Sequence, residues 1–335
     1  MEKIRAVNLG GWFVLEKWIK PSLFNDNDVI GNDETKFSNQ VANKEEVLYN
    51  HYKTWITKED IIWLKDKGIN LVRIPIPWWL YGEGEYVRSV KHLDDALDMI
   101  SDVGMDFMLD LHTAPGCQNA FDNGGIEGVM NWHKEDSNLE KTIEILEKVA
   151  VRYKKYPRFH SIQILNEPHY EIDLDFIKDF HLRAYKRLRK ILPDRWIVFC
   201  NSFRLSGWED FFKKNDFYKV ILDTHIYQCF GDYHLNHTIP MHEEAALSRA
   251  KRLAEVEEYV PVIVGEWSLG LRKNKSITNS NFDEALTKYA SAQIQGMNKC
   301  SGYVFWTYKT EDPNSAWDFK GLIERGIIDL EEFIK

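Results

Sequence analysis

The sequence predicts an α/β fold, a (β/α)8 barrel that forms a single domain over residues 1–335. Short apolar runs of strand-forming residues alternate with amphipathic segments about eight times along the chain. No two of these runs are joined by a clear two-residue hairpin turn, so the strands are expected to be parallel. A doubly wound open sheet is the structural rival, but neither GxGxxG nor a P-loop follows the first run.

The first half of the chain contains three expected strands. Gly10-Gly11 ends the first, and a long polar insertion over 25–50 follows. Thr57 is the expected N-cap of a helix that ends at Gly68. The strands are expected over 4–9, 69–75 and 105–112, and the helices over 57–67 and 91–103.

The second half repeats the alternation five more times. Ser137 and Asp173 are the expected starts of two long helices. The last segment, 322–334, is expected to return across the bottom of the barrel. The strands are expected over 162–168, 196–201, 220–227, 260–267 and 302–306, and the helices over 137–156, 173–192, 242–258 and 282–299.

Two of these strands end in a glutamate. Asn166-Glu167 closes one apolar run, and Pro168 is expected to hold Glu167 in an extended conformation. Glu266 closes another run about 100 residues later. Two carboxylates at strand ends on one sheet suit glycoside hydrolysis, in which a retaining enzyme needs carboxyl groups about 5–5.5 Å apart. One group is then a nucleophile kept ionised, and the other is an acid/base that is kept protonated at first.

Polar or aromatic residues end nearly every other strand, and in a barrel these ends meet at one pocket. Arg73 and Tyr227 are expected to hydrogen-bond Glu266 and keep it anionic. His112 and His225 are expected to position substrate or hold the carboxylates, with Trp306 as the floor beneath a sugar ring. Burying so many polar groups without a function would be costly.

A metal site is the competing interpretation for His112 and His225. They come from distant strands, and the sequence contains neither HxH nor HExxH. We therefore expect no metal and no other cofactor.

Composition narrows the class of partner. The net charge is −9 and no Lys/Arg cluster stands out, so nucleic acid is not expected. No apolar run reaches the length of a membrane span. Aromatic residues make up 13% of the chain, which suits sugar rings with flat C–H faces. The four cysteines are far apart and no export signal is visible, so a cytoplasmic location is expected, or a secreted one if a leader is removed.

Asn166-Glu167-Pro168 and Gly265-Glu266-Trp267 resemble the acid/base and nucleophile motifs of glycoside hydrolase family 5, a family of retaining barrel enzymes. The resemblance implies that Glu167 is the acid/base and Glu266 the nucleophile. It also implies a set of substrate-binding positions, namely Arg73, His112, Asn166, His225, Tyr227 and Trp306.

Longer motifs resemble the exo-β-1,3-glucanase branch of that family. They lie at 8–16, 112–123 and 305–311. This resemblance implies that Glu16, Asp122 and Asn123 close a pocket around the terminal glucose, and that Phe121 and Phe230 clamp the next sugar. It further implies a cis peptide bond after Trp306. The sequence departs from the branch at Thr113 and Thr307, where Gly and Ser are usual.

These observations predict a retaining hydrolase of β-glucosidic bonds that acts from the end of β-1,3-glucan or its oligosaccharides. An endo-β-1,4-glucanase, or a β-glucosidase acting on mixed-linkage oligosaccharides or glucosides, remains an alternative on the same mechanism. A carbohydrate-binding barrel without activity is a third possibility, which the presence of both glutamates disfavours.

Overall fold

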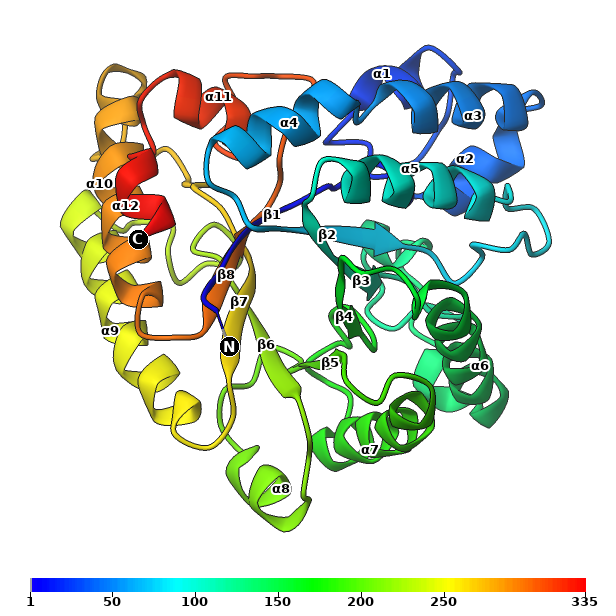
Figure 1. The fold of residues 1–335 in the computed structure, drawn as a ribbon. Coiled ribbons are helices and arrows are strands. Elements are labelled where there is room, and N and C mark those ends of the chain that lie inside the picture. Colours follow the sequence, from blue (N-terminus) through cyan, green and yellow to red (C-terminus); the bar gives the residue numbers. More distant parts are fainter. Residues whose placement is uncertain (1) are drawn as a thin grey trace.

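A computed structural model describes residues 2–335 and confirms the predicted barrel. Eight parallel strands pair in chain order, and β8 pairs with β1 to close the ring. The helices surround this ring (Figure 1). The strands are β1 Ile4–Asn8, β2 Leu71–Ile76, β3 Asp106–Leu111, β4 Phe159–Gln163, β5 Trp196–Cys200, β6 Val220–Ile226, β7 Val262–Trp267 and β8 Gly302–Phe305.

The major helices follow the strands as predicted. Their bounds are α4 Lys58–Asp66, α5 Val90–Asp102, α6 Asp136–Tyr153, α7 Leu174–Ile191, α9 Ile239–Glu257 and α10 Phe282–Met297. Two predicted N-caps are confirmed. Thr57 forms a capping box with Asp60 at the start of α4, and the Asp173 carboxylate accepts from two backbone N–H groups at the start of α7.

Several local expectations are wrong. Only residues 162 and 163, the last two of β4, belong to the strand that was expected over 162–168. Arg73 lies in the middle of β2 rather than at the end of that strand. Glu135, not Ser137, occupies the N-cap position of α6. The polar insertion contains helices, the 322–334 segment consists of two short helices, and one further helix lies between β5 and β6. The bounds of these smaller helices are α1 Pro21–Asn25, α2 Glu34–Gln40, α3 Lys44–Thr54, α8 Glu209–Lys214, α11 Phe319–Glu324 and α12 Leu330–Ile334.

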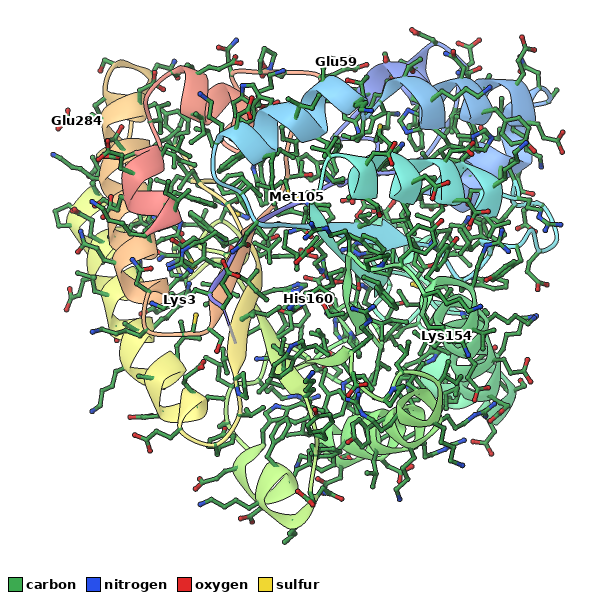
Figure 2. All side chains as sticks on the ribbon, viewed as in Figure 1. Lys3, Glu59, Met105, Lys154, His160 and Glu284 are labelled. Carbon is green, nitrogen blue, oxygen red and sulfur yellow. The ribbon has the colours of Figure 1, made fainter. Side chains whose placement is uncertain are left out.

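The interior of the barrel is divided into two layers. Side chains fill the space inside the ring of strands (Figure 2). One layer is a separate apolar cluster of Ile4, Ala6, Leu71, Met108, Val198, Ile221, Ile263 and Val304. Because strand side chains alternate between faces, the residues two positions further along also point inward. These next positions include Asn8, Arg73, Asp110 and Asp223, all fully buried, so the core changes from apolar to polar toward the strand C-termini.

Among the described residues, 2–335, the helices are all too short or too polar to cross a bilayer.

Candidate active site

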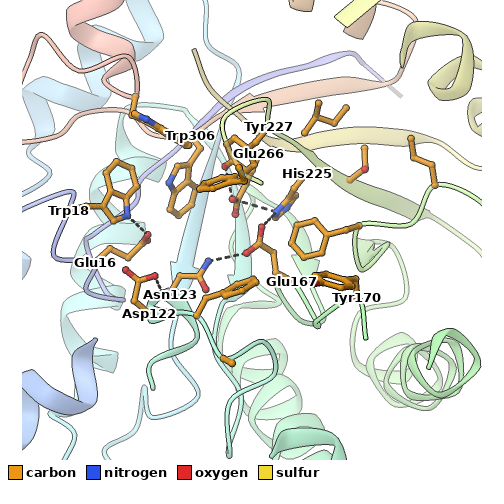
Figure 3. A pocket seen from close by; sticks show the side chains of 18 of the residues that line it. Glu16, Trp18, Asp122, Asn123, Glu167, Tyr170, His225, Tyr227, Glu266 and Trp306 are labelled. Atoms are coloured by element: carbon orange, nitrogen blue, oxygen red, sulfur yellow. Dashed lines mark hydrogen bonds and ion pairs between the residues drawn. The ribbon is translucent and has the colours of Figure 1, made fainter. Parts of the chain in front are cut away.

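A cavity of about 990 Å³ opens at the C-terminal ends of the strands. Figure 3 shows both predicted glutamates and the side chains around them. Most of the predicted site residues line this cavity, namely Glu16, Phe121, Asp122, Asn123, Glu167, His225, Tyr227, Phe230, Glu266 and Trp306. Arg73, His112 and Asn166 lie behind its wall, where each is fully buried.

The two glutamates reach the cavity from different kinds of backbone. Glu266 is part of β7, whereas Glu167 lies in the loop after β4. The extended conformation expected of Glu167 is wrong, because its φ is +43°, in the left-handed region. The loop on either side of it is held by backbone hydrogen bonds from Asn166 N to Leu111 O and from His169 N to Gln118 O. A left-handed glutamate costs about 1–3 kcal/mol, so these bonds hold the carboxylate in place at the expense of backbone energy.

The spacing of the two carboxylates fits a retaining mechanism. One side-chain oxygen of Glu167 lies within 4.8 Å of one of Glu266. Retaining glycosidases have carboxyl groups about 5–5.5 Å apart, whereas inverting ones separate them by about 6.5–9.5 Å to admit a water. This spacing is close to the range for retaining enzymes and below the range for inverting ones, so the geometry favours direct attack by a carboxylate.

Arg73 connects Glu266 to the polar layer of the barrel. Its Nη1 donates to Glu266 Oε1 at 3.0 Å and to Asn8 Oδ1 at 2.7 Å. Its Nη2 donates to Asn166 Oδ1 at 2.7 Å and pairs with Asp110 Oδ2 at 3.1 Å. On the other side of the Glu266 carboxylate, the Tyr227 hydroxyl donates to Glu266 Oε2 at 2.9 Å. Both hydrogen bonds that the sequence predicted for Glu266 are therefore present.

His225 lies between the two glutamates. Its Nδ1 is 2.7 Å from Glu167 Oε1 and 3.4 Å from Glu266 Oε2, and its Nε2 is 3.1 Å from Asp223 Oδ2 (Figure 3). Burial lowers the pKa of His225, but the carboxylates of Glu266 and Asp223 outweigh burial and hold it well above the usual value. The imidazole is therefore protonated and donates to carboxylates on both sides.

The pKa of Glu167 moves the other way. Burial raises the pKa, but the hydrogen bonds from His225 and Asn123 outweigh it and bring the pKa below the usual value. The free site thus holds a proton on His225 Nδ1, 2.7 Å from the carboxylate that would act as the acid. These two shifts place the proton on His225 rather than on Glu167, so the expectation of an acid/base group that starts protonated is wrong for the free site.

The pKa of Glu266 is raised rather than lowered. Burial is the largest cause and the charge of Glu167 adds to it, and together they outweigh the opposing charges of His225 and Arg73. The sequence expectation was that Arg73 and Tyr227 keep Glu266 anionic; their hydrogen bonds are present, but they do not bring its pKa below the usual value. The pKa of this carboxyl depends on the protonation of its neighbours, so the three groups titrate together.

His112 stands behind the cavity wall and supports Trp306. Its Nδ1 is 2.5 Å from Asp110 Oδ2, which fixes the ring orientation. The imidazole stacks on the Trp306 indole with ring centroids 5.4 Å apart and an interplanar angle of 3°. The peptide bond between Trp306 and Thr307 is cis, as the family resemblance implied.

One end of the cavity carries a second pair of acids. Glu16 Oε2 accepts from Trp18 Nε1 at 2.9 Å, while its Oε1 is buried with no hydrogen-bond partner among residues 2–335. Burial raises the pKa of Glu16 well above its usual value, and the charge of Asp122 adds to this; burial also raises the pKa of Asp122. Next to them, Asn123 Nδ2 donates to Glu167 Oε2 at 3.0 Å. This end therefore offers acceptors and donors to several hydroxyl groups.

Aromatic rings also line the cavity. Phe121 and Phe230 are 37% and 63% exposed. Phe230 packs on Tyr227 and Trp317, with ring centroids 5.4 and 6.1 Å away. Tyr170 and Phe203 also line the cavity. Flat apolar faces at an opening suit the C–H faces of a sugar ring.

Sequence reasoning missed residues of two kinds. Asp110 and Asp223 precede His112 and His225 by two positions, and the Asp-x-His pattern places each pair on one face of its strand. That repeated pattern could have revealed them. In contrast, Trp18 and Trp317 line the cavity from irregular loops, where no periodicity indicates which side chain points inward.

Glu167, His225 and Glu266 are close enough to hold a metal ion, with ligand atoms within 4.8 Å of one another. However, a protonated imidazole has no lone pair to offer. The arrangement therefore suits proton sharing better than metal binding.

The family model and the most similar curated proteins indicate the same family. The model of the family described as "Cellulase (glycosyl hydrolase family 5)" matches residues 31–312. The probable glucan 1,3-beta-glucosidase A of Emericella nidulans is 32% identical, with the alignment covering 97% of this chain and 90% of that protein. The glucan 1,3-beta-glucosidase of Schwanniomyces occidentalis is 31% identical over 97% of this chain and 87% of its own length. Among solved structures, rutinosidase from Aspergillus niger superposes with a TM-score of 0.84 at 20% identity, covering 98% of both chains.

Proposed function

Because this chain belongs to glycoside hydrolase family 5, we propose that it releases glucose by a retaining mechanism from the ends of β-1,3-glucan or its oligosaccharides. The observation that carries the mechanism is the short separation of the Glu167 and Glu266 carboxylates, with oxygens within 4.8 Å. The linkage rests on the relatives named glucan 1,3-beta-glucosidases and on the acidic end of the cavity.

The proposed first step joins the sugar to the enzyme. Glu266 attacks the anomeric carbon while Glu167 gives its proton to the glycosidic oxygen, so the C–O bond breaks and the leaving sugar departs as an alcohol. Arg73 and Tyr227 hold Glu266 in place through its two oxygens. Because the proton of the free site lies on His225, substrate binding must first move it from His225 Nδ1 to Glu167 along the 2.7 Å hydrogen bond, against the order of the two pKa values.

The proposed second step releases the sugar. Glu167, now a carboxylate, removes a proton from water, and the hydroxide attacks the anomeric carbon and displaces Glu266. Glu167 can return its new proton to His225, so the resting arrangement is restored. The two inversions leave the product with the configuration of the substrate.

Action from the chain end is proposed because of Glu16 and Asp122. Both side chains line the same end of the cavity as Asn123, which contacts Glu167. Acceptors at that end suit the free hydroxyls of a terminal glucose. Phe121 and Phe230, at the exposed end, would stack on the next sugar.

Product analysis tests this proposal. Laminari-oligosaccharides and cello-oligosaccharides are incubated side by side, and the fresh anomer is followed by NMR. We expect single glucose units of β configuration from the β-1,3 series. Fragments from the middle of the β-1,4 series would instead support the endo-β-1,4-glucanase alternative, and α-glucose would refute the retaining mechanism.

Substitution of the two glutamates separates their roles. Glu266→Gln should abolish turnover of every substrate. Glu167→Ala should lower kcat by about 10²–10⁴-fold on oligosaccharides, but much less on aryl glucosides whose leaving group needs no proton. Azide should rescue Glu167→Ala and yield β-glucosyl azide, because it attacks the glycosyl-enzyme without a general base. Wild-type turnover by Glu266→Gln would refute the assignment, and so would failure of azide to rescue Glu167→Ala.

A cytoplasmic location stays a proposal. Its support is that the four cysteines are free and that Cys117, Cys200 and Cys300 are buried. Fractionation of cells producing the native protein tests it, and recovery of the activity from the medium would refute it.

A further inference from the structure

A second cluster of titratable side chains lies outside the active site, in the loop between β6 and α9. His234, His237 and His242 are buried, with exposures of 7%, 7% and 1%. One ring nitrogen from each lies within 4.8 Å of the others. The family motifs do not include His234 and His237, and the proposed mechanism uses none of the three.

The hydrogen bonds of His242 show which of its nitrogens is free. Gln228 donates through Nε2 to the His242 carbonyl at 3.2 Å, so its Oε1 is left to accept from His242 Nδ1 at 2.7 Å. With the proton on Nδ1, the lone pair is on Nε2. This atom is buried and has no hydrogen-bond partner within residues 2–335. Metal-binding histidines are fixed in this way, by donating their other N–H to an oxygen acceptor.

The spacing of the other two histidines fits one metal ion. Nδ1 of His234 and Nδ1 of His237 are 3.1 Å apart. Two nitrogens bound to a tetrahedral Zn²⁺ at about 2.0–2.1 Å lie about 3.4 Å apart.

We propose that His234, His237 and Nε2 of His242 form a structural site for a divalent cation of the Zn²⁺ class. Imidazole suits such ions, and three neutral nitrogens leave one position for a small ligand. The inference does not depend on the proposed glycosidase activity.

Arg249 and Tyr289 bear on the fourth position. The positive charge of Arg249 is close enough to be felt at both His234 and His242, and it would repel a bare metal cation. Its Nη1 and the Tyr289 hydroxyl are also buried without partners among the described residues. An anionic fourth ligand such as hydroxide or chloride would offset the repulsion by Arg249, so we expect an anion in the fourth position.

The site would stabilise the loop that carries Tyr227 and Phe230. Asn274 Nδ2 already donates to the carbonyls of Leu235 and His237. A metal ion would join this loop to the first turn of α9, because His242 belongs to that helix.

Metal uptake by the tag-free full-length enzyme tests the proposal. The protein is stripped with chelator and dialysed against Zn²⁺, and the bound metal is measured by mass spectrometry. Co²⁺ then reports the geometry through its visible absorption. We expect about one equivalent of Zn²⁺ and the intense bands of four-coordinate Co²⁺. Uptake below about a tenth of an equivalent would overturn the proposal, as would stabilisation by phosphate or sulfate but not by Zn²⁺.

Matched variants locate the ion. His234→Gln/His237→Gln should lose stoichiometric uptake, whereas His160→Gln, at the opposite end of the barrel on β4, should keep it. Gln228→Ala retains all three ligands and should weaken affinity by about 10–100-fold, because it removes the acceptor that fixes the His242 ring. Undiminished binding by the double variant would refute the assignment of these ligands.

Discussion

Removal of the Tyr227 hydroxyl should shift the pH dependence of the enzyme. Its oxygen donates to Glu266 Oε2 at 2.9 Å, and this donor favours the anionic form of the carboxyl. A hydrogen bond to a charged group contributes about 1.5–3 kcal/mol, and one pKa unit corresponds to about 1.36 kcal/mol. Tyr227→Phe should therefore raise the pKa of Glu266 by about 1–2 units.

The sign of the change follows from the proposed role of Glu266. The nucleophile must be ionised, so activity rises with pH as Glu266 loses its proton. Its pKa is already above the usual value in the wild type, and the variant raises it further. The acid limb of kcat/KM should move to higher pH by about 1–2 units, because kcat/KM reports the free enzyme.

The assay is the pH profile of kcat/KM on an aryl β-glucoside from pH 3 to pH 9. Tyr170→Phe is the matched control, since Tyr170 also lines the cavity but is 57% exposed. Its profile should match that of the wild type. An acid limb that stays in place in Tyr227→Phe would show that this hydrogen bond does not control the ionisation of Glu266.

Three further changes have defined outcomes. His225→Asn removes the charge that lowers the pKa of Glu266, so the acid limb should move to higher pH. It also removes the imidazole that holds the proton for Glu167 at a pKa well above the usual value, so the alkaline limb should move to lower pH; an unchanged profile would contradict proton sharing with Glu167. Phe230→Ala should raise KM for laminari-oligosaccharides by up to about tenfold, because it removes the ring proposed to stack on the second sugar. KM for small aryl glucosides, which have no second sugar, should stay nearly unchanged. Asp60→Asn should lower the free energy of unfolding by about 0.5–2 kcal/mol in urea, because Asp60 caps α4 and accepts from Lys309 at 2.7 Å. Since its pKa is lowered in the fold, this difference should be present at neutral pH and vanish as pH falls through that pKa.

Much of the fold could be predicted because a parallel barrel repeats one pattern. Each strand is a short apolar run and each major helix has an apolar face, so the order of elements followed from periodicity alone. The caps at Thr57 and Asp173 were predictable because a single side chain makes the bond. Ser137 failed as a cap because the helix already begins at Asp136, which leaves Glu135 in the N-cap position.

Site residues that lie on strands could be predicted more easily than site residues that lie on loops. Arg73 and His225 lie on strands, and alternation points them inward. Glu266 also lies on a strand, but it faces inward because the register of β7 shifts after Val264, which alternation alone does not predict. The left-handed turn at Glu167 depends on hydrogen bonds to distant segments, which a local rule about Pro168 does not include. The raised pKa of Glu266 could not be predicted from the sequence either, because it depends on how deeply three charged groups are buried together.

The His-x2-His-x4-His spacing at 234–242 was visible in the sequence. The spacing alone predicted no site, because these histidines lie on a loop and at the start of α9 rather than at the strand ends. The structure adds the fact that all three rings are buried and face one another.

The two layers inside the barrel have a consequence for engineering. The apolar layer, with Met108 and Ile263 among its members, is a cluster of its own and contains no side chain that lines the cavity. Substitutions that fill or reshape it can raise the melting temperature while the chemistry stays as it is. In the polar layer, by contrast, Arg73 is bonded to Asn8, Gln163, Asn166 and Glu266 at once, so a gain in stability there would come at a loss of rate. A thermostable form of this enzyme should therefore be sought near the strand N-termini.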